Sequence, residues 1–115
     1  MVATIGGENM ITWSKIDRRD IPAINVAIDW SDNRQLYLSS VDLAPVLEMN
    51  VEDVIELSKE GSFVDTYGIT YLKSQAILSM LEELNTTLCK QVHYWISADI
   101  LPSIQAMPYA TALKL

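Results

Sequence analysis

An amphipathic helix is predicted over residues 92–104, which read VHYWISADILPSI. Trp95 stands among aliphatic residues at helical spacing, and a large aromatic side chain in that setting normally packs inward. Leu101 and Ile104 continue the same apolar side. We therefore expect all three residues to belong to the core, on a closing helix that begins near Thr87.

The composition is that of a single globular domain. The chain has 115 residues, of which 50% are hydrophobic and 20% charged, and this is enough for one core. No apolar run reaches the roughly 18 residues that a membrane span needs. Residues 1–8 lack the basic and apolar regions of a signal peptide, so we expect a cytoplasmic location.

Charge and cysteine usage narrow the classes of function. The net charge of −7 repels phosphate and argues against a broad electrostatic grip on nucleic acid. The single cysteine, Cys89, allows no internal disulfide, and together with the single His93 it cannot make a structural zinc site. We expect the protein to need no cofactor.

Residues 1–22 are expected to form a weakly ordered arm ahead of the main domain. Two adjacent glycines interrupt any regular structure there, and residues 17–20 carry mixed charges. Trp13 and Ile16 could dock this arm onto the body of the protein.

Two β-hairpins are expected in the main domain. Apolar residues alternate over residues 24–30, turn formers occupy 31–34, and residues 36–38 resume an extended run. Tyrosines and β-branched residues around a glycine predict a second, shorter hairpin within residues 63–72.

Two helices are predicted between these hairpins. Ser39 or Ser40 can cap the first helix, with Asp42 in its first turn. The second helix is predicted to begin after Asn50 and to stop at Gly61.

A further helix is predicted over residues 73–84, ahead of the closing helix. Together these elements predict an α+β fold in which small β-hairpins pack against about four helices. The main domain is expected to span residues 23–106, and a short tail, residues 107–115, follows it.

The two helices between the hairpins have helix-turn-helix spacing. Ala44 is small and Val54 is apolar, and this spacing lets two short helices cross closely. Glu48 stands where a glycine usually opens the turn. Carboxylates dominate the second helix, where Lys59 is accompanied by Glu52, Asp53, Glu56 and Glu60. Such a helix lacks the donors that read bases and phosphates, so we expect it to build core rather than to read DNA.

Three blocks of the chain resemble the BRO-type amino-terminal domain of phage antirepressors. The ending of its last helix is matched by Trp95, Ile100, Leu101, Pro102, Ser103 and Ile104. Residues 37–44 are similar to the stretch that begins the family's first helix, with Asp42 as the aspartate, and residues 68–72 are similar to its Gly-Leu-Tyr-x-Leu element. The resemblance implies a BRO-like fold and a phage or prophage regulator.

The chain departs from that family where basic residues are expected. After residue 104 the family continues with Arg-Lys and a Gly-x-Tyr turn, whereas residues 105–109 here contain no cation. Lys90 and His93 replace the arginines that commonly precede the family's tryptophan. The resemblance therefore does not bring DNA binding with it.

No arrangement typical of an enzyme is found. Three carboxylate pairs, Asp29–Asp32, Asp53–Glu56 and Glu82–Glu83, lie beside polar residues without a nearby histidine, and we interpret them as solvated. Cys89 and His93 share a helix face, which we interpret as a half-buried pair rather than a nucleophile and its base. We expect a protein that is not an enzyme.

A protein partner is the favoured target. An acidic surface suits a basic DNA-binding protein or host regulator. The residues expected to contact this partner are the acidic ones of the second helix, Glu52, Asp53, Glu56 and Glu60, and two aromatics flanking the first hairpin turn, Trp30 and Tyr37.

The alternative is a regulator that binds DNA itself. It would use a local basic cluster made of Arg18, Arg19, Arg34, Lys73 and Lys90. In either case the apolar final helix makes a homodimer possible.

Overall fold

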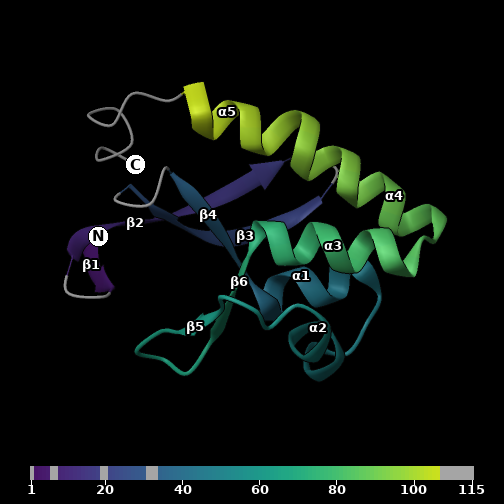
Figure 1. Ribbon diagram of the computed structural model, residues 1–115, viewed down its shortest axis with the longest axis horizontal. Coiled ribbons are helices and arrows are strands. Elements are labelled where there is room, and N and C mark those ends of the chain that lie inside the picture. Colours follow the sequence, from purple (N-terminus) through teal and green to yellow (C-terminus); the bar gives the residue numbers. More distant parts are fainter. Residues whose placement is uncertain (1, 6–7, 19–20, 31–33, 107–115) are drawn as a thin grey trace.

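The fold is α+β, as predicted: helices cover one face of an antiparallel sheet (Figure 1). The structure is a computed structural model that describes residues 2–5, 8–18, 21–30 and 34–106, with side chains for 11–16, 23–30 and 34–106. The sheet has six strands in the order β1-β2-β3-β4-β6-β5. The strands are β1 Val2–Ile5, β2 Glu8–Arg18, β3 Ile21–Asp29, β4 Gln35–Ser39, β5 Phe63–Val64 and β6 Thr70–Lys73. The helical segments are α1 Ser40–Leu47, α2 Val51–Leu57, α3 Ser74–Leu84, α4 Thr87–Tyr94, η1 Trp95–Ile100 and α5 Leu101–Ala106.

The expectation of a weakly ordered arm was wrong for most of its length. β2 spans 11 residues and pairs antiparallel with β3, from Ile11 opposite Asp29 to Arg18 opposite Ile21. The boundary at residue 22 falls inside β3. The glycines and charges at the two ends of this segment concealed a strand between them. The docking role of Trp13 is confirmed, because its ring meets Tyr71 edge-on at 5.0 Å.

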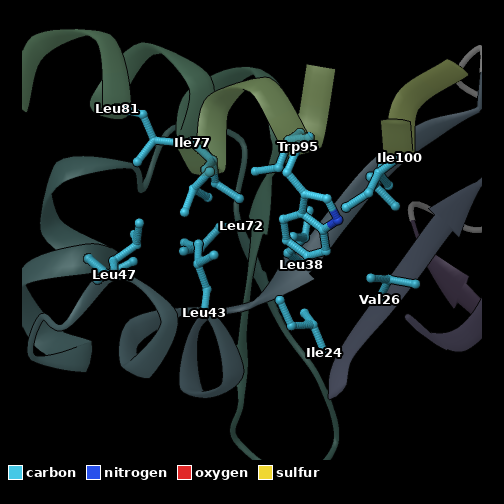
Figure 2. Close-up of a cluster of buried hydrophobic side chains, with 14 of the residues drawn as sticks. Ile24, Val26, Leu38, Leu43, Leu47, Leu72, Ile77, Leu81, Trp95 and Ile100 are labelled. Carbon is cyan, nitrogen blue, oxygen red and sulfur yellow. The ribbon is translucent and has the colours of Figure 1, made fainter. Parts of the chain in front are cut away.

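Both hairpins are confirmed, and the main core lies between the sheet and the helices. The alternation of the first hairpin turns Ile24, Val26 and Ile28 toward the helices, where they are fully or almost fully buried. Figure 2 shows sheet and helix side chains meeting in this layer. It includes Leu38 and Leu72 from the sheet and, from the helices, Leu43, Leu47, Ile77, Leu81, Trp95 and Ile100.

A second, smaller cluster covers the opposite face of the sheet. Tyr37 and Tyr71 are buried there with Ile11 and Ala27. Phe63 stacks on Tyr71 at 5.5 Å, with the ring planes 9° apart. This aromatic cluster anchors β5 and β6 to the sheet even though β5 has only two residues.

The first two helices begin as predicted, but the second ends early. The Ser39 hydroxyl accepts a bond from the Asp42 amide at 3.4 Å and caps α1. α2 ends at Leu57 rather than at Gly61. The backbone leaves the helix at Ser58, with φ −136° and ψ 29°, and the Ser58 hydroxyl donates to the Val54 carbonyl. Gly61, with φ +77°, instead forms the turn that leads to β5.

The predicted closing helix is confirmed, with one change of helical type. It runs without a break from Thr87 to Ala106, but residues 95–100 are a π-helix. One π turn brings residues five apart onto the same side, so Trp95 and Ile100 both face the core. Ile104 is buried as predicted, whereas Leu101 is only partly buried.

Candidate functional site

A tight turn joins α1 to α2 and holds the two helices against each other. Ala44 and Val54 are almost fully buried, as the helix-turn-helix spacing requires. Glu48 adopts the left-handed conformation, with φ 56° and ψ 41°. Its amide donates to the carbonyls of Ala44 and Pro45 and so ends α1. The turn therefore has the geometry that a glycine usually supplies, with a glutamate in its place.

The outer side of α2 is acidic. Its carboxylates Glu52, Asp53 and Glu56, and Glu60 just beyond its end, are all exposed. Lys59 pairs with Glu56 at 3.1 Å, but both side chains are more than 60% exposed, so the pair contributes little to stability. Leu57 lies one turn after Asp53 and is 48% exposed. This side of α2, made of Glu52, Asp53, Glu56 and Leu57, is called the acidic face below.

The β5–β6 hairpin follows α2 and has a well-defined tip. The Oδ1 atom of Asp65 accepts bonds from the amides of Tyr67 at 2.8 Å and Ile69 at 2.9 Å. Backbone bonds from Asp65 to Ile69 and from Gly68 to Asp65 close the same turn, and Gly68 takes φ +83°. This fixed turn presents Tyr67, which is 83% exposed, and Val64, which is 60% exposed.

Tyr67 was not among the residues that the sequence marked as functional. The signal was present: an aspartate three residues before a glycine predicts an Asx-type turn, and a tyrosine inside such a turn is held outward. The segment was predicted only as a short hairpin around Gly68, and no role was assigned to the side chains at its turn.

The helix pair α1–α2 stands between a strand and a hairpin of the same sheet. Strand β4 leads into α1 and α2, and the hairpin β5–β6 follows. β6 lies between β4 and β5 in the sheet, so the hairpin is attached to the strand that precedes the helix pair. Figure 1 shows α2 and this hairpin on the side of the molecule opposite α5, apart from each other along the long axis.

Trp30 and Tyr37 do not join the acidic face. Tyr37 is 8% exposed and belongs to the aromatic cluster, so the expectation of an exposed anchor there was wrong. Trp30 is partly buried against the main core, and its Nε1 donates to the Thr12 hydroxyl at 2.8 Å. The Arg34 guanidinium lies over the Trp30 ring, 5.3 Å from its centroid, so Trp30 packs against a residue of its own hairpin.

The basic residues of the alternative hypothesis are not gathered into one patch within the described part of the chain. Arg34 donates to the carbonyl of Gln105 at the end of α5, which gives it a structural role. Lys73 precedes α3 and Lys90 lies on α4, so the 11 residues of α3, about 16 Å long, lie between them in the chain. Arg19 and the side chain of Arg18 lie outside the described residues.

Two carboxylates have surroundings that the sequence did not predict. Glu82 on α3 was expected to lack a nearby histidine, but its Oε2 lies 3.1 Å from Nε2 of His93 on α4. Asp29 is 8% exposed rather than solvated. Among the remaining carboxylates of the three pairs, Asp53 and Glu56 are exposed, as expected. Asp32 lies outside the described residues.

The described residues hold no group of three or more histidine, cysteine, aspartate or glutamate side chains that could bind a metal ion. Cys89 is buried and unbridged. Within the same residues no helix is long and apolar enough to cross a membrane.

One titratable group in the aromatic cluster has a shifted pKa. Burial raises the pKa of the Tyr71 phenol above its ordinary value, and the negative charges of Asp65 and Asp42 raise it further. Asp42 is itself held by Asn25, whose backbone and side-chain amides both donate to its Oδ2 at 2.9 Å. The Tyr71 phenol, next to the base of the hairpin, therefore loses its proton at a higher pH than an exposed tyrosine does.

Comparison with known proteins finds no matching family model, no matching curated protein and no matching solved structure. The resemblance to the BRO-type domain therefore rests on its three blocks of sequence alone.

Proposed function

We propose that this protein is a regulator of the phage or prophage type that acts by contacting a basic protein, such as a DNA-binding regulator or a host factor. The acidic face of α2 is the surface that would make this contact. The proposal includes a cytoplasmic location and the absence of catalytic activity, and it allows for a homodimer.

The observation that carries the proposal is the exposure of the α2 carboxylates. In a helix-turn-helix, the second helix approaches DNA, and each carboxylate placed beside a phosphate would weaken binding. Glu52, Asp53 and Glu56 point into solvent at that position, and Lys59 is already paired with Glu56. The same charges attract a basic protein surface and speed its association at low salt.

Direct DNA binding by a BRO-type domain is the second candidate, and the arrangement of α1, α2 and the β5–β6 hairpin favours it. The positions of the described cations count against it, because Arg34 is engaged by Gln105 and Trp30 and the two lysines lie apart. Arg18 and Arg19 would have to supply most of the phosphate contacts.

Binding measurements on the purified protein separate the two candidates. A gel shift with mixed-sequence duplex DNA at about 50 mM salt is expected to show no complex. A basic polypeptide probe, poly-L-lysine, is expected to bind in a salt-sensitive manner, because few counterions shield the acidic face at that ionic strength. Tight DNA binding that Arg18→Ala/Arg19→Ala/Arg34→Ala removes would reverse the order of the two candidates.

A pair of variants with equal charge change tests the surface. Glu52→Gln/Glu56→Gln removes two carboxylates of the acidic face, and Glu82→Gln/Glu83→Gln removes two exposed carboxylates from the end of α3. The first variant is expected to weaken binding of the basic probe several-fold more than the second. Equal weakening by both would show that net charge, rather than the acidic face, attracts the probe.

A further inference from the structure

The closing helix has several weak points within a few residues. Residues 95–100 are a π-helix, which is a rare form and a place where helices kink. The Leu101 amide donates to the Ile96 carbonyl, five residues earlier, as this form requires. Pro102 follows immediately and has no amide to donate to the preceding turn. The regular α-helical hydrogen bonding of α4 is therefore interrupted over residues 95–102.

Side-chain contacts weaken the same segment further. The Ser97 hydroxyl donates to the His93 carbonyl at 2.8 Å. The Ser103 hydroxyl donates to the Asp99 carbonyl at 2.7 Å. A serine that bonds to the carbonyl four residues before it slightly destabilises a helix and often bends it. The buried indole Nε1 of Trp95 has no hydrogen-bond partner among the described residues, which makes the closed arrangement less stable still.

The helix beyond this segment, α5, is held by few contacts. Ile104 is 6% exposed and packs into the main core, and Leu101 is partly buried against it. The other side chains of α5 are exposed. The Arg34 guanidinium, from the end of the first hairpin turn, donates to the Gln105 carbonyl. Release of α5 would therefore remove little from the core.

We propose that residues 95–102 are a hinge about which α5 opens from the sheet as a unit, and that Arg34 is the latch that holds it closed. This inference goes beyond the proposed function and does not depend on it. Figure 1 shows α4 and α5 as the two ends of one long helical rod. Opening exposes Ile104, whereas α4 stays in place because Cys89 and Val92 are buried in the core. Elements that move in this way belong to the least stable parts of a fold.

Native-state hydrogen exchange, followed by NMR at single amides, tests the hinge. The amides of residues 103–106 are expected to exchange at one common rate, at least about ten-fold faster than those of residues 91–94 in α4. Arg34→Ala should speed exchange at 103–106 about three- to ten-fold, as the loss of one hydrogen bond implies, and leave 91–94 nearly unchanged. Pro102→Ala returns an amide to the segment, so it should slow exchange at 103–106 by a similar factor. Lys59→Ala is the matched control for Arg34→Ala, because it removes an exposed cation next to α2 and should change neither segment.

The competing explanation is fraying of the helix end, which gives a different profile. Exchange that rises residue by residue towards 106 and does not respond to Pro102→Ala would mean fraying, and the hinge would be wrong. Equal acceleration of 91–94 and 103–106 by Arg34→Ala, or the same effect from Lys59→Ala, would mean that Arg34 is not a latch. Exchange at 103–106 as slow as at 91–94 would show that α5 does not open separately and would overturn the inference.

Discussion

Replacing Glu48 with glycine is expected to stabilise the protein, because this residue holds the turn between α1 and α2 in a conformation that glycine adopts without strain. Glu48 has φ 56° and ψ 41°, and its amide donates to the carbonyls of Ala44 and Pro45. A residue with a Cβ atom in the left-handed region costs about 1–2 kcal/mol. Glycine avoids that cost but is more flexible when unfolded, which returns about 0.5–1 kcal/mol. The free energy of unfolding should therefore rise by roughly 0.5–1 kcal/mol.

Urea and thermal unfolding measure this change. A gain of that size corresponds to a Tm increase of about 2–4 °C for a domain of this length. The Glu48 side chain is exposed, so no packing is lost when it is removed. Asn85 provides a comparison, since it ends α3 with φ 53° but asparagine tolerates this region better. Asn85→Gly should accordingly give a smaller gain.

Glu48→Ala is the control that separates backbone strain from charge. It removes the same carboxylate from an acidic chain but keeps the Cβ atom, so it should leave stability nearly unchanged. If Glu48→Ala stabilises the protein as much as Glu48→Gly, relief of charge repulsion explains the gain and the strain argument is refuted. A loss of stability in Glu48→Gly would refute it as well.

Three further perturbations follow from the packing and from the hairpin. Leu43→Ala should cost about 2–5 kcal/mol in urea unfolding because Leu43 is fully buried, whereas Val41→Ala, 47% exposed two residues away, should change stability by less than about 1 kcal/mol. Tyr71→Phe should remove part of the alkaline loss of stability. Because the pKa of Tyr71 is raised in the fold, this residue loses its proton first in the unfolded chain. Its contribution to stability is therefore complete below the ordinary tyrosine pKa of about 10 and is lost as the pH rises through the folded pKa. Asp65→Ala should speed hydrogen exchange at the amides of Tyr67 and Ile69 while exchange in α3 stays slow, and equal acceleration in both places would contradict a local role for Asp65.

Local rules were sufficient to predict the helix starts and the hairpins. Ser39 caps α1 because a serine hydroxyl just before a helix can accept a hydrogen bond from a free amide of the first turn. The alternation over residues 24–28 puts all its large apolar side chains on one face of the strand, so only that face can be buried. The strand β2 was missed because its apolar residues are fewer and its ends carry glycines and charges. Its pairing with β3 is a contact that the composition of the segment alone does not reveal. The π turn at residues 95–100 was also missed, because the apolar pattern predicts that the segment is helical but not the type of helix; Figure 2 shows its Trp95 and Ile100 in the core.

Predictions about the candidate site fared unevenly, because exposure depends on the whole fold. The α2 carboxylates are exposed as a polar helix side should be, and the sequence was sufficient to expect this. Tyr37 was expected near a turn and therefore outside, but Phe63 comes from a distant strand and meets its ring. His93 and Glu82 are 11 residues apart and meet only because α3 and α4 pack antiparallel.

The fold and the charges of this protein point to different ligands, and our proposal follows the charges. A helix pair followed by a hairpin places α2 and the hairpin on the side of the molecule opposite α5, whatever residues they carry (Figure 1). Architecture of this kind hosts unrelated functions, so the ligand has to be inferred from the exposed side chains. For DNA, Glu52, Asp53 and Glu56 each add repulsion that the scattered lysines do not offset. For a basic protein, the same three carboxylates are attractive. The sign of the charge on one short helix therefore makes a protein partner the more consistent target.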